Sequence, residues 1–238
     1  MLKSLRPIAQ EFIEKRLVTR PFAAGDVIYE EGARATHAIF PHSGRLSLMA
    51  VMTSGRSVDK LSVGHEGFVG LELVLDGEQT TSRTIARVPG HASWLSVADL
   101  DEAIARFECV TPTMLHFAKA LIVQTMESVA CNSLHVADQR VARWLLHARD
   151  SATSDTLEIT QQAIAESLGL RRATVNQICN SFFAAGVIDH SRGSILIRDR
   201  AALEERSCEC HGRIRRAFEA ASAAAPAGLG VSEADAAI

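Results

Sequence analysis

The sequence predicts an α+β protein with an N-terminal antiparallel β-roll, a long dimerisation helix and a C-terminal winged helix-turn-helix. Three observations support this fold class. Glycines separate short apolar runs over residues 20–96, residues 113–135 contain neither glycine nor proline, and residues 159–188 have the pattern of two short helices joined by a tight turn. We expect the roll over 1–110, the long helix over 111–137, the helix-turn-helix domain over 138–218 and a disordered tail over 219–238.

The composition excludes several classes of protein. The chain has 238 residues, 47% of them hydrophobic, and a net charge of −3, so bulk charge does not hold it to nucleic acid. Residues 138–216 carry 12 basic and 10 acidic side chains, which places a slight basic excess where the helix-turn-helix pattern lies. There is no membrane-length apolar run, no secretory signal at the N-terminus and no disulfide framework among the five cysteines. We therefore expect a cytoplasmic protein with no membrane partner.

The N-terminal part is expected to start with an amphipathic helix over residues 4–17 and then to change period. Short apolar runs separated by glycine turns predict strands at residues 27–29, 38–40, 46–49, 58–63 and 84–88. Turn signals at spacings near ten are typical of an antiparallel roll or barrel, and cupin-like folds have the same architecture.

A helical period returns after this region. A short helix is expected over residues 99–107, and Pro112 is tolerated at the start of a much longer helix that reaches about residue 135. Along it, six residues recur at alternating spacings of three and four, as in the a/d seam of a parallel dimer: Leu115, Ala118, Ile122, Thr125, Val129 and Asn132. The alternative is that this helix packs only on its own roll. A further helix is expected over residues 138–148.

The helix-turn-helix pattern depends on caps and on periodicity. Thr160 is a candidate N-cap of the first helix, and Gly169 stands where that helix must end in a left-handed conformation. A second helix is expected over residues 171–183, with three apolar side chains on its inner face: Val175, Ile178 and Phe182. An ordinary helical hairpin is the alternative, but the cap, the glycine and a polar outer face agree with a helix that enters the major groove of DNA.

The outer face of the second helix suits the reading of base edges. Asn and Gln can bond adenine in two places, Arg can bond guanine or hold a phosphate, and this face has almost no acid. A two-stranded wing follows, and Arg192 near its tip either contacts a phosphate or is simply solvated. A single final helix is expected over residues 201–218. The expected DNA contacts are Thr160, Gln161, Arg171, Arg172, Ala173, Thr174, Asn176, Gln177, Asn180 and Arg192.

The order of these parts resembles the Crp/Fnr family of bacterial transcription regulators over about residues 20–200. The segments that carry the resemblance most strongly are ADQRVARWLLHARD and ITQQAIAESLGLRRATVNQICNSFFAAGVI. The resemblance implies a cytoplasmic homodimer that binds a two-fold-symmetric site on double-stranded DNA, has RNA polymerase as a partner and senses a small-molecule effector in the roll. By the same resemblance, the effector region would include Gly70, Glu72, Arg83, Thr84 and Thr125.

The chain departs from the members of that family that bind cyclic AMP. They carry a Gly-Glu pair for the ribose hydroxyl, whereas Gly70 is followed here by Leu71, which cannot accept a hydrogen bond. Arg83-Thr84 matches their phosphate-binding pair only after a one-residue insertion, and a one-residue slip reverses the face of a strand. We expect an effector other than cyclic AMP. The alternative is a DNA-binding dimer that senses nothing and keeps the roll as a scaffold.

The residues indicate no enzyme, no cofactor and no metal site. A cupin-type metal enzyme would need a His-x-His pair with a nearby acid, and the roll contains no such pair. The iron–sulfur members of the family need an N-terminal cysteine cluster, but the first cysteine here is Cys109. Cys208, Cys210 and His211 lie within four residues, yet sites of that kind normally need a second, distant pair of ligands. We interpret these cysteines as structural or incidental.

Overall fold

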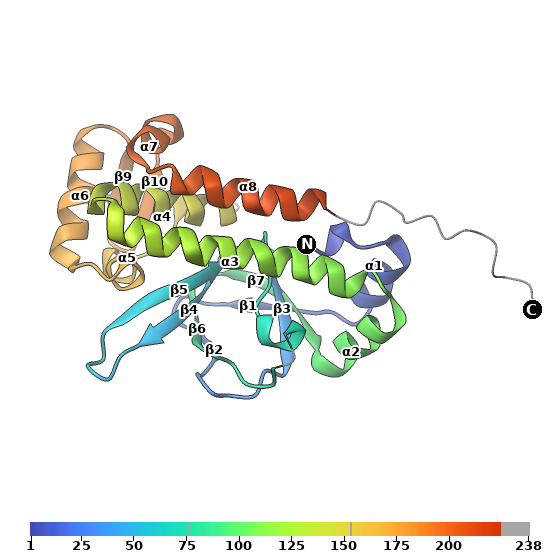
Figure 1. Cartoon of the computed structure of the whole chain (residues 1–238). Coiled ribbons are helices and arrows are strands. Elements are labelled where there is room, and N and C mark those ends of the chain that lie inside the picture. The colour runs from blue at the N-terminus through green and yellow to red at the C-terminus, as the bar shows by residue number, and fades with distance from the viewer. Residues whose placement is uncertain (76, 153, 225–238) are drawn as a thin grey trace, which may run out of the picture.

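The computed structural model describes residues 1–75, 77–152 and 154–224, and its elements follow the expected order (Figure 1). The N-terminal part contains η1 (Leu2–Ser4), α1 (Pro7–Glu14), β1 (Val18–Phe22), β2 (Val27–Tyr29), β3 (His37–Pro41), β4 (Arg45–Val51), β5 (Ser57–Val63), η2 (Leu71–Val74), β6 (Arg83–Val88), β7 (Gly90–Ser96) and α2 (Val97–Arg106). The long helix α3 (Val110–Leu134) joins it to α4 (Ala137–Ser151), β8 (Thr156–Leu157), α5 (Gln161–Leu168), α6 (Arg172–Ala184), β9 (Ile188–Ser191), β10 (Ser194–Ile197), α7 (Arg200–Arg206) and α8 (Cys210–Ala223).

The roll consists of two antiparallel sheets with strand orders β1-β7-β3 and β2-β6-β4-β5. All five strands expected from the apolar runs are present as β2 to β6. The sequence missed β1 and β7. Strand β1 is largely exposed and contains Pro21, which an edge strand tolerates because one side makes no ladder hydrogen bonds. Strand β7 is half polar and is held between two partners, since Trp94 pairs with both Val18 and Ile39.

Helix α3 lies along the roll, and its inner face completes the N-terminal core. Phe117 and Leu121 on this helix are fully buried in the same cluster as Phe68 and Leu95 of the roll. None of the helices that the structure describes is long and apolar enough to cross a bilayer.

The single helix expected over residues 201–218 is wrong, because the chain breaks into α7 and α8. Ser207 is extended at the break, with φ −80° and ψ 161°. The two helices serve different cores: Leu203 is buried in the C-terminal core, whereas Ile214 and Phe218 are buried against α3 and the roll. Helix α8 therefore runs antiparallel along α3 (Figure 1), and the boundary between the two cores falls in the turn at residues 207–209.

The C-terminal core gathers α4, α5, α6, α7 and a three-stranded sheet of order β8-β10-β9. The expected wing is β9 and β10, and β8 adds a short third strand that the sequence did not indicate. Residues 219–223, expected in the disordered tail, belong to α8, and residues 225–238 of that tail lie outside the described part of the chain.

Candidate nucleic-acid interface

The helix-turn-helix forms through the local interactions that the sequence indicates. The Thr160 hydroxyl accepts a hydrogen bond from the backbone N–H of Ala163 at 3.1 Å and so caps α5. Gly169 follows α5 with φ 64°, and the N–H of Leu170 donates to the carbonyl of Ala165 at 2.9 Å, which closes the turn. On α6, Val175, Ile178 and Phe182 are buried in the C-terminal core, as expected.

The opposite face of α6 is exposed and carries no acidic side chain. Arg171 is the N-cap residue and Arg172 the first helical residue, so two guanidinium groups stand at the positive end of the helix dipole. Such a helix end attracts phosphate and other anions. The remaining exposed residues of the expected reading face are Ala173, Asn176, Gln177 and Asn180, while Thr174 and Gln161 are half-buried.

The wing is attached to the recognition face through His190, a residue that sequence reasoning did not single out. His190 Nε2 lies 3.1 Å from Asn180 Oδ1, and its ring packs against Phe183 with centroids 5.6 Å apart. Asn180 is thus engaged in the attachment of β9 to α6. Arg192 is exposed in the β9–β10 turn, where Gly193 has φ 83°. Only the pairing of strands brings His190 to α6, so no local sequence signal could have found it.

The first helix of the motif, α5, docks on the roll through an ionic contact. Arg87 Nη1 on β6 lies 3.0 Å from Glu166 Oε2 on α5, and Arg87 Nε is 3.9 Å from Asp59 Oδ1. Burial raises the pKa of Asp59, and Arg87 together with serine hydroxyls opposes that shift. Nearby, Arg140 Nη2 donates to the carbonyl of Leu168 at 2.6 Å. These contacts tie α5 to the roll and to α4.

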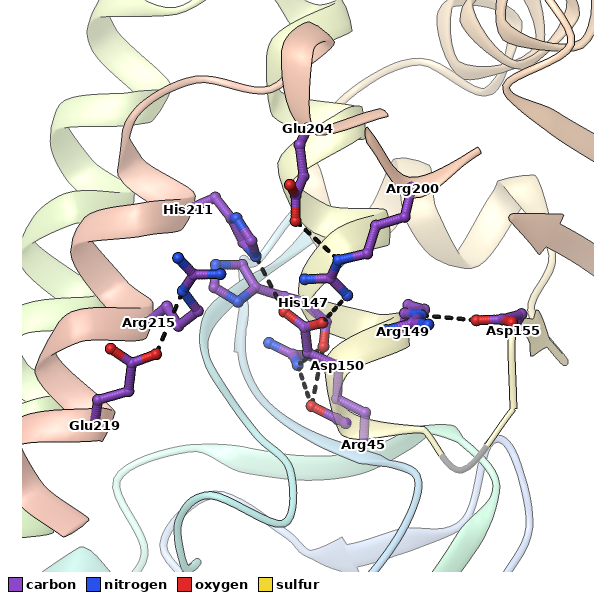
Figure 2. A network of polar contacts seen from close by, with 11 residues as sticks. Arg45, His147, Arg149, Asp150, Asp155, Arg200, Glu204, His211, Arg215 and Glu219 are labelled. Atoms are coloured by element: carbon purple, nitrogen blue, oxygen red, sulfur yellow. Dashed lines mark hydrogen bonds and ion pairs between the residues drawn. The ribbon is translucent and has the colours of Figure 1, made fainter. Parts of the chain in front are cut away.

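Asp150, at the end of α4, is the centre of a polar network that joins α4, α7 and α8 (Figure 2). Arg200 Nη1 donates to Asp150 Oδ1 at 2.5 Å, and His211 Nε2 lies 3.1 Å from Asp150 Oδ2. Burial opposes ionisation of this carboxyl, but the hydrogen bonds from His211 and Arg200 outweigh it and lower the pKa of Asp150. His147 packs edge-on against His211, and burial with nearby arginines lowers the pKa of His147 well below its usual value.

A cavity of about 710 Å³ opens beside this network, between the roll, α4 and α8. Its size suits a small molecule. None of the residues that the resemblance implies for the effector region lines it. The lining includes His65, Glu66, Gln124, His147, Asp150, Arg200 and Phe218.

The residues of the expected effector region do not converge as a nucleotide clamp would require. Arg83 and Thr84 are consecutive on β6, so they face opposite sides: Thr84 is buried in the roll, and Arg83 Nε lies 3.0 Å from Glu30 Oε2. Glu72 is half-buried in η2, where burial raises its pKa. Gly70 precedes η2 with φ 110°, and the Thr125 hydroxyl donates to the carbonyl of Leu121 in its own helix.

An apolar stripe runs along the side of α3 that faces away from the roll. Leu115 is 42% exposed, Ile122 50% and Val129 64%, and Met126, which the seam did not include, is 66% exposed. Of the other expected seam residues, Asn132 is exposed, Thr125 is half-buried and Ala118 is buried.

Two protein-family models match this chain. The cyclic nucleotide-binding domain matches residues 19–107, and the Crp-like helix-turn-helix domain matches residues 139–206. The two matches flank α3 and together cover more than half of the chain. The chain belongs to the Crp/Fnr family of transcription regulators. It is therefore a DNA-binding regulator rather than an enzyme, and its helix-turn-helix is the DNA-binding part.

Several solved structures share the fold of this chain. FixK2 from Bradyrhizobium japonicum is 17% identical with a TM-score of 0.69, covering 81% of this chain and 98% of its own. The CRP-family regulator TTHB099 from Thermus thermophilus is 19% identical with a TM-score of 0.65, covering 79% and 96%. The c-di-GMP-responsive regulator CLP from Xanthomonas campestris is 16% identical with a TM-score of 0.58, covering 81% and 99%. No curated protein matches the chain.

Proposed function

We propose that this Crp/Fnr protein reads a palindromic site on double-stranded DNA with the outer face of α6. The observation that carries the proposal is that face, which exposes two arginines and three amide side chains and has no acid. Arg172, Asn176 and Gln177 would contact base edges. Around them, phosphate contacts and register would come from Arg171, Thr160, Gln161, Ala173, Thr174, Asn180 and Arg192.

The DNA-binding unit would be a homodimer that forms along α3. Leu115, Ile122, Met126 and Val129 form a continuous apolar stripe, and the spacing of a parallel seam matches it. A two-fold axis along this stripe would place two α6 helices about 34 Å apart, one turn of duplex, so the site should be palindromic. RNA polymerase, in the bacterial cytoplasm, is the partner that a transcription regulator of this kind would need.

The effector would be a molecule other than cyclic AMP. Leu71 stands where a ribose acceptor would be needed, and Arg83 is paired with Glu30 instead of facing the interior of the roll. Calorimetry with cyclic AMP should give no micromolar isotherm. A clear isotherm would overturn this part of the proposal.

A second candidate is a DNA-binding dimer that senses nothing. The pairing of Arg83 with Glu30 favours it, because the arginine that the resemblance implies for a phosphate is paired with a carboxylate at the surface of the roll. Thermal denaturation against a ligand panel separates the two candidates, since a ligand that binds only the folded state raises the melting temperature by mass action. A shift with any small molecule supports the sensor, and no shift across the panel supports the scaffold.

The main test is selection of bound duplexes from a random pool, with and without cell extract. Enrichment of a palindrome with half-sites one helical turn apart would support the reading by α6. A change of enrichment on addition of extract would indicate an effector. Recovery of unrelated sequences in both arms would contradict the proposed recognition face.

A further inference from the structure

Three buried cysteines and one histidine meet where the end of α3 touches the turn between α7 and α8. Cys131 lies in the last turn of α3 and His135 is the C-cap of that helix, whereas Cys208 lies in the break between α7 and α8 and Cys210 is the first residue of α8. Their ligand atoms all lie within 4.8 Å of one another. In the sequence, only Cys208, Cys210 and His211 were recognised as possible ligands. The fold brings Cys131 and His135 to Cys208 and Cys210, and these two are the distant pair of ligands that the sequence did not show.

The ligand distances fit a tetrahedral metal ion. Cys131 Sγ lies 3.5 Å from Cys208 Sγ, and Cys210 Sγ lies 3.7 Å from His135 Nδ1. Zinc bonds of about 2.3 Å to sulfur and about 2.0 Å to nitrogen place neighbouring ligand atoms about 3.5–3.8 Å apart. An ion would therefore need only small movements of these side chains.

The surroundings of the four residues also favour a metal site. His135 Nε2 lies 3.3 Å from Glu209 Oε2, so the carboxylate can accept from that nitrogen and leave Nδ1 as the ligand atom. The guanidinium of Arg143 on α4 is buried beside these residues. Its Nε finds no hydrogen-bond partner among the described residues. A positive charge here offsets the excess negative charge that three thiolates would leave on a divalent ion.

Neither of the simpler explanations accounts for the whole cluster. The three cysteines form a buried group apart from both apolar cores, so they are not ordinary filling of either core. A disulfide between Cys131 and Cys208 would leave Cys210 and His135 facing each other without a role. His211 does not belong to the cluster, because it bonds Asp150.

We propose that Cys131, His135, Cys208 and Cys210 form a structural zinc site. Three cysteines with one histidine are a usual closed ligand set for zinc, and thiolates select zinc over magnesium or calcium. This replaces our expectation from the sequence that the chain has no metal site. The ion would fasten α8 to the end of α3, next to the α3–α4 junction that joins the roll to the DNA-binding domain (Figure 1).

The test is zinc content of the full chain, purified under reducing conditions without chelator. We expect about one zinc per chain, and tetrahedral thiolate absorption after cobalt replacement. Cys131→Ser and Cys208→Ser should lose the zinc, whereas Cys109→Ser, at another buried free cysteine outside the cluster, should keep it. A chelator should lower the melting temperature of the wild type, and zinc but not magnesium should restore it.

Glu209→Gln keeps the inference testable if the cysteine variants do not fold, because Glu209 is largely exposed. It should weaken zinc binding by about 10–100-fold in competition with a chelating dye. Three results would overturn the inference. They are a zinc content below about a tenth of an ion per chain, a loss of zinc in Cys109→Ser as large as in the cluster variants, or a Cys131–Cys208 disulfide in protein purified under reducing conditions. DNA binding by the wild type is a separate readout, so failure of the zinc site and failure of the proposed function can be told apart.

Discussion

At the scale of single residues, Gln177 and Arg171 are expected to contribute differently to DNA binding. Gln177 is exposed in the middle of α6, where we expect it to reach a base, whereas Arg171 is the N-cap of that helix, where we expect a phosphate contact. Gln177→Ala should cost about 1–3 kcal/mol on the selected site and relax one base position. Arg171→Ala should weaken all duplexes alike and lower the salt slope by about one.

Binding titrations on the selected site and on random DNA at several salt concentrations measure both effects. Gln10→Ala, at a half-buried position of α1 in the N-terminal part, is a control outside the DNA-binding domain and should bind as the wild type does. If Gln177→Ala weakens binding to random DNA as much as to the selected site, α6 does not read bases.

His147 is expected to make the protein less stable in mild acid. Burial lowers the pKa of His147 and holds its ring neutral, Arg45, Arg143 and His211 act in the same direction, and only Asp150 opposes them; its Nε2 is buried without a hydrogen-bond partner in the described chain. Because its pKa is lowered in the folded state, the unfolded chain takes up the proton first as the pH falls below about 6.5. The stability that the neutral ring of His147 contributes is present above that pH. It is lost as the pH falls towards the pKa that His147 has in the folded state.

Urea unfolding of the wild type and of His147→Phe between pH 7 and pH 5 tests this. The variant should reduce the loss of stability at pH 5 by up to about 2 kcal/mol. Equal pH slopes for the two proteins would show that His147 does not cause the effect.

At the scale of elements, the exposed stripe of α3 decides whether the protein is a dimer. Ile122→Glu and Val129→Glu place charges at its centre, so the double variant should be a monomer, because an unpaired charge in an apolar seam is strongly unfavourable. Its affinity for a palindromic site should fall with the dimer. Sedimentation velocity gives the oligomeric state.

Ala105→Glu, at an exposed position of α2 and outside α3, is the control and should sediment as the wild type does. A double variant that remains a dimer would move the interface away from α3.

At the scale of the whole molecule, Arg87 on β6 pairs both with Asp59 inside the roll and with Glu166 on α5 of the C-terminal domain. Arg87 and Asp59 are each only 10% exposed, so Arg87→Met leaves a buried carboxylate without its cation. We expect a loss of about 3–5 kcal/mol in unfolding free energy. Asp59→Asn in the same chain should recover most of it, because the amide oxygen can still accept from Ser47 and Ser62.

Arg56→Met, at an exposed position between β4 and β5, should change little and serves as the control. Urea unfolding of the four proteins completes the comparison. If the double variant is no more stable than Arg87→Met, the cost arises from lost packing rather than from the unpaired charge.

The sequence by itself determined the parts of this protein that depend on neighbours within one or two helical turns. The cap at Thr160, the left-handed Gly169 and the inward spacing of Val175, Ile178 and Phe182 all act over short distances, so the helix-turn-helix could be derived with its boundaries. Strands with continuous apolar runs were found for the same reason, as was the exposed apolar stripe of α3.

The tertiary structure decided everything that depends on residues far apart in the chain. Strands β1 and β7 exist because they pair with each other, and α7 and α8 separate because Leu203 and Phe218 pack in different cores. Cys131 meets Cys208 across 77 residues, and His211 meets Asp150 across 61. Such encounters depend on how whole elements pack, and no local period or hydrogen bond encodes them, so they become visible only when the chain is folded.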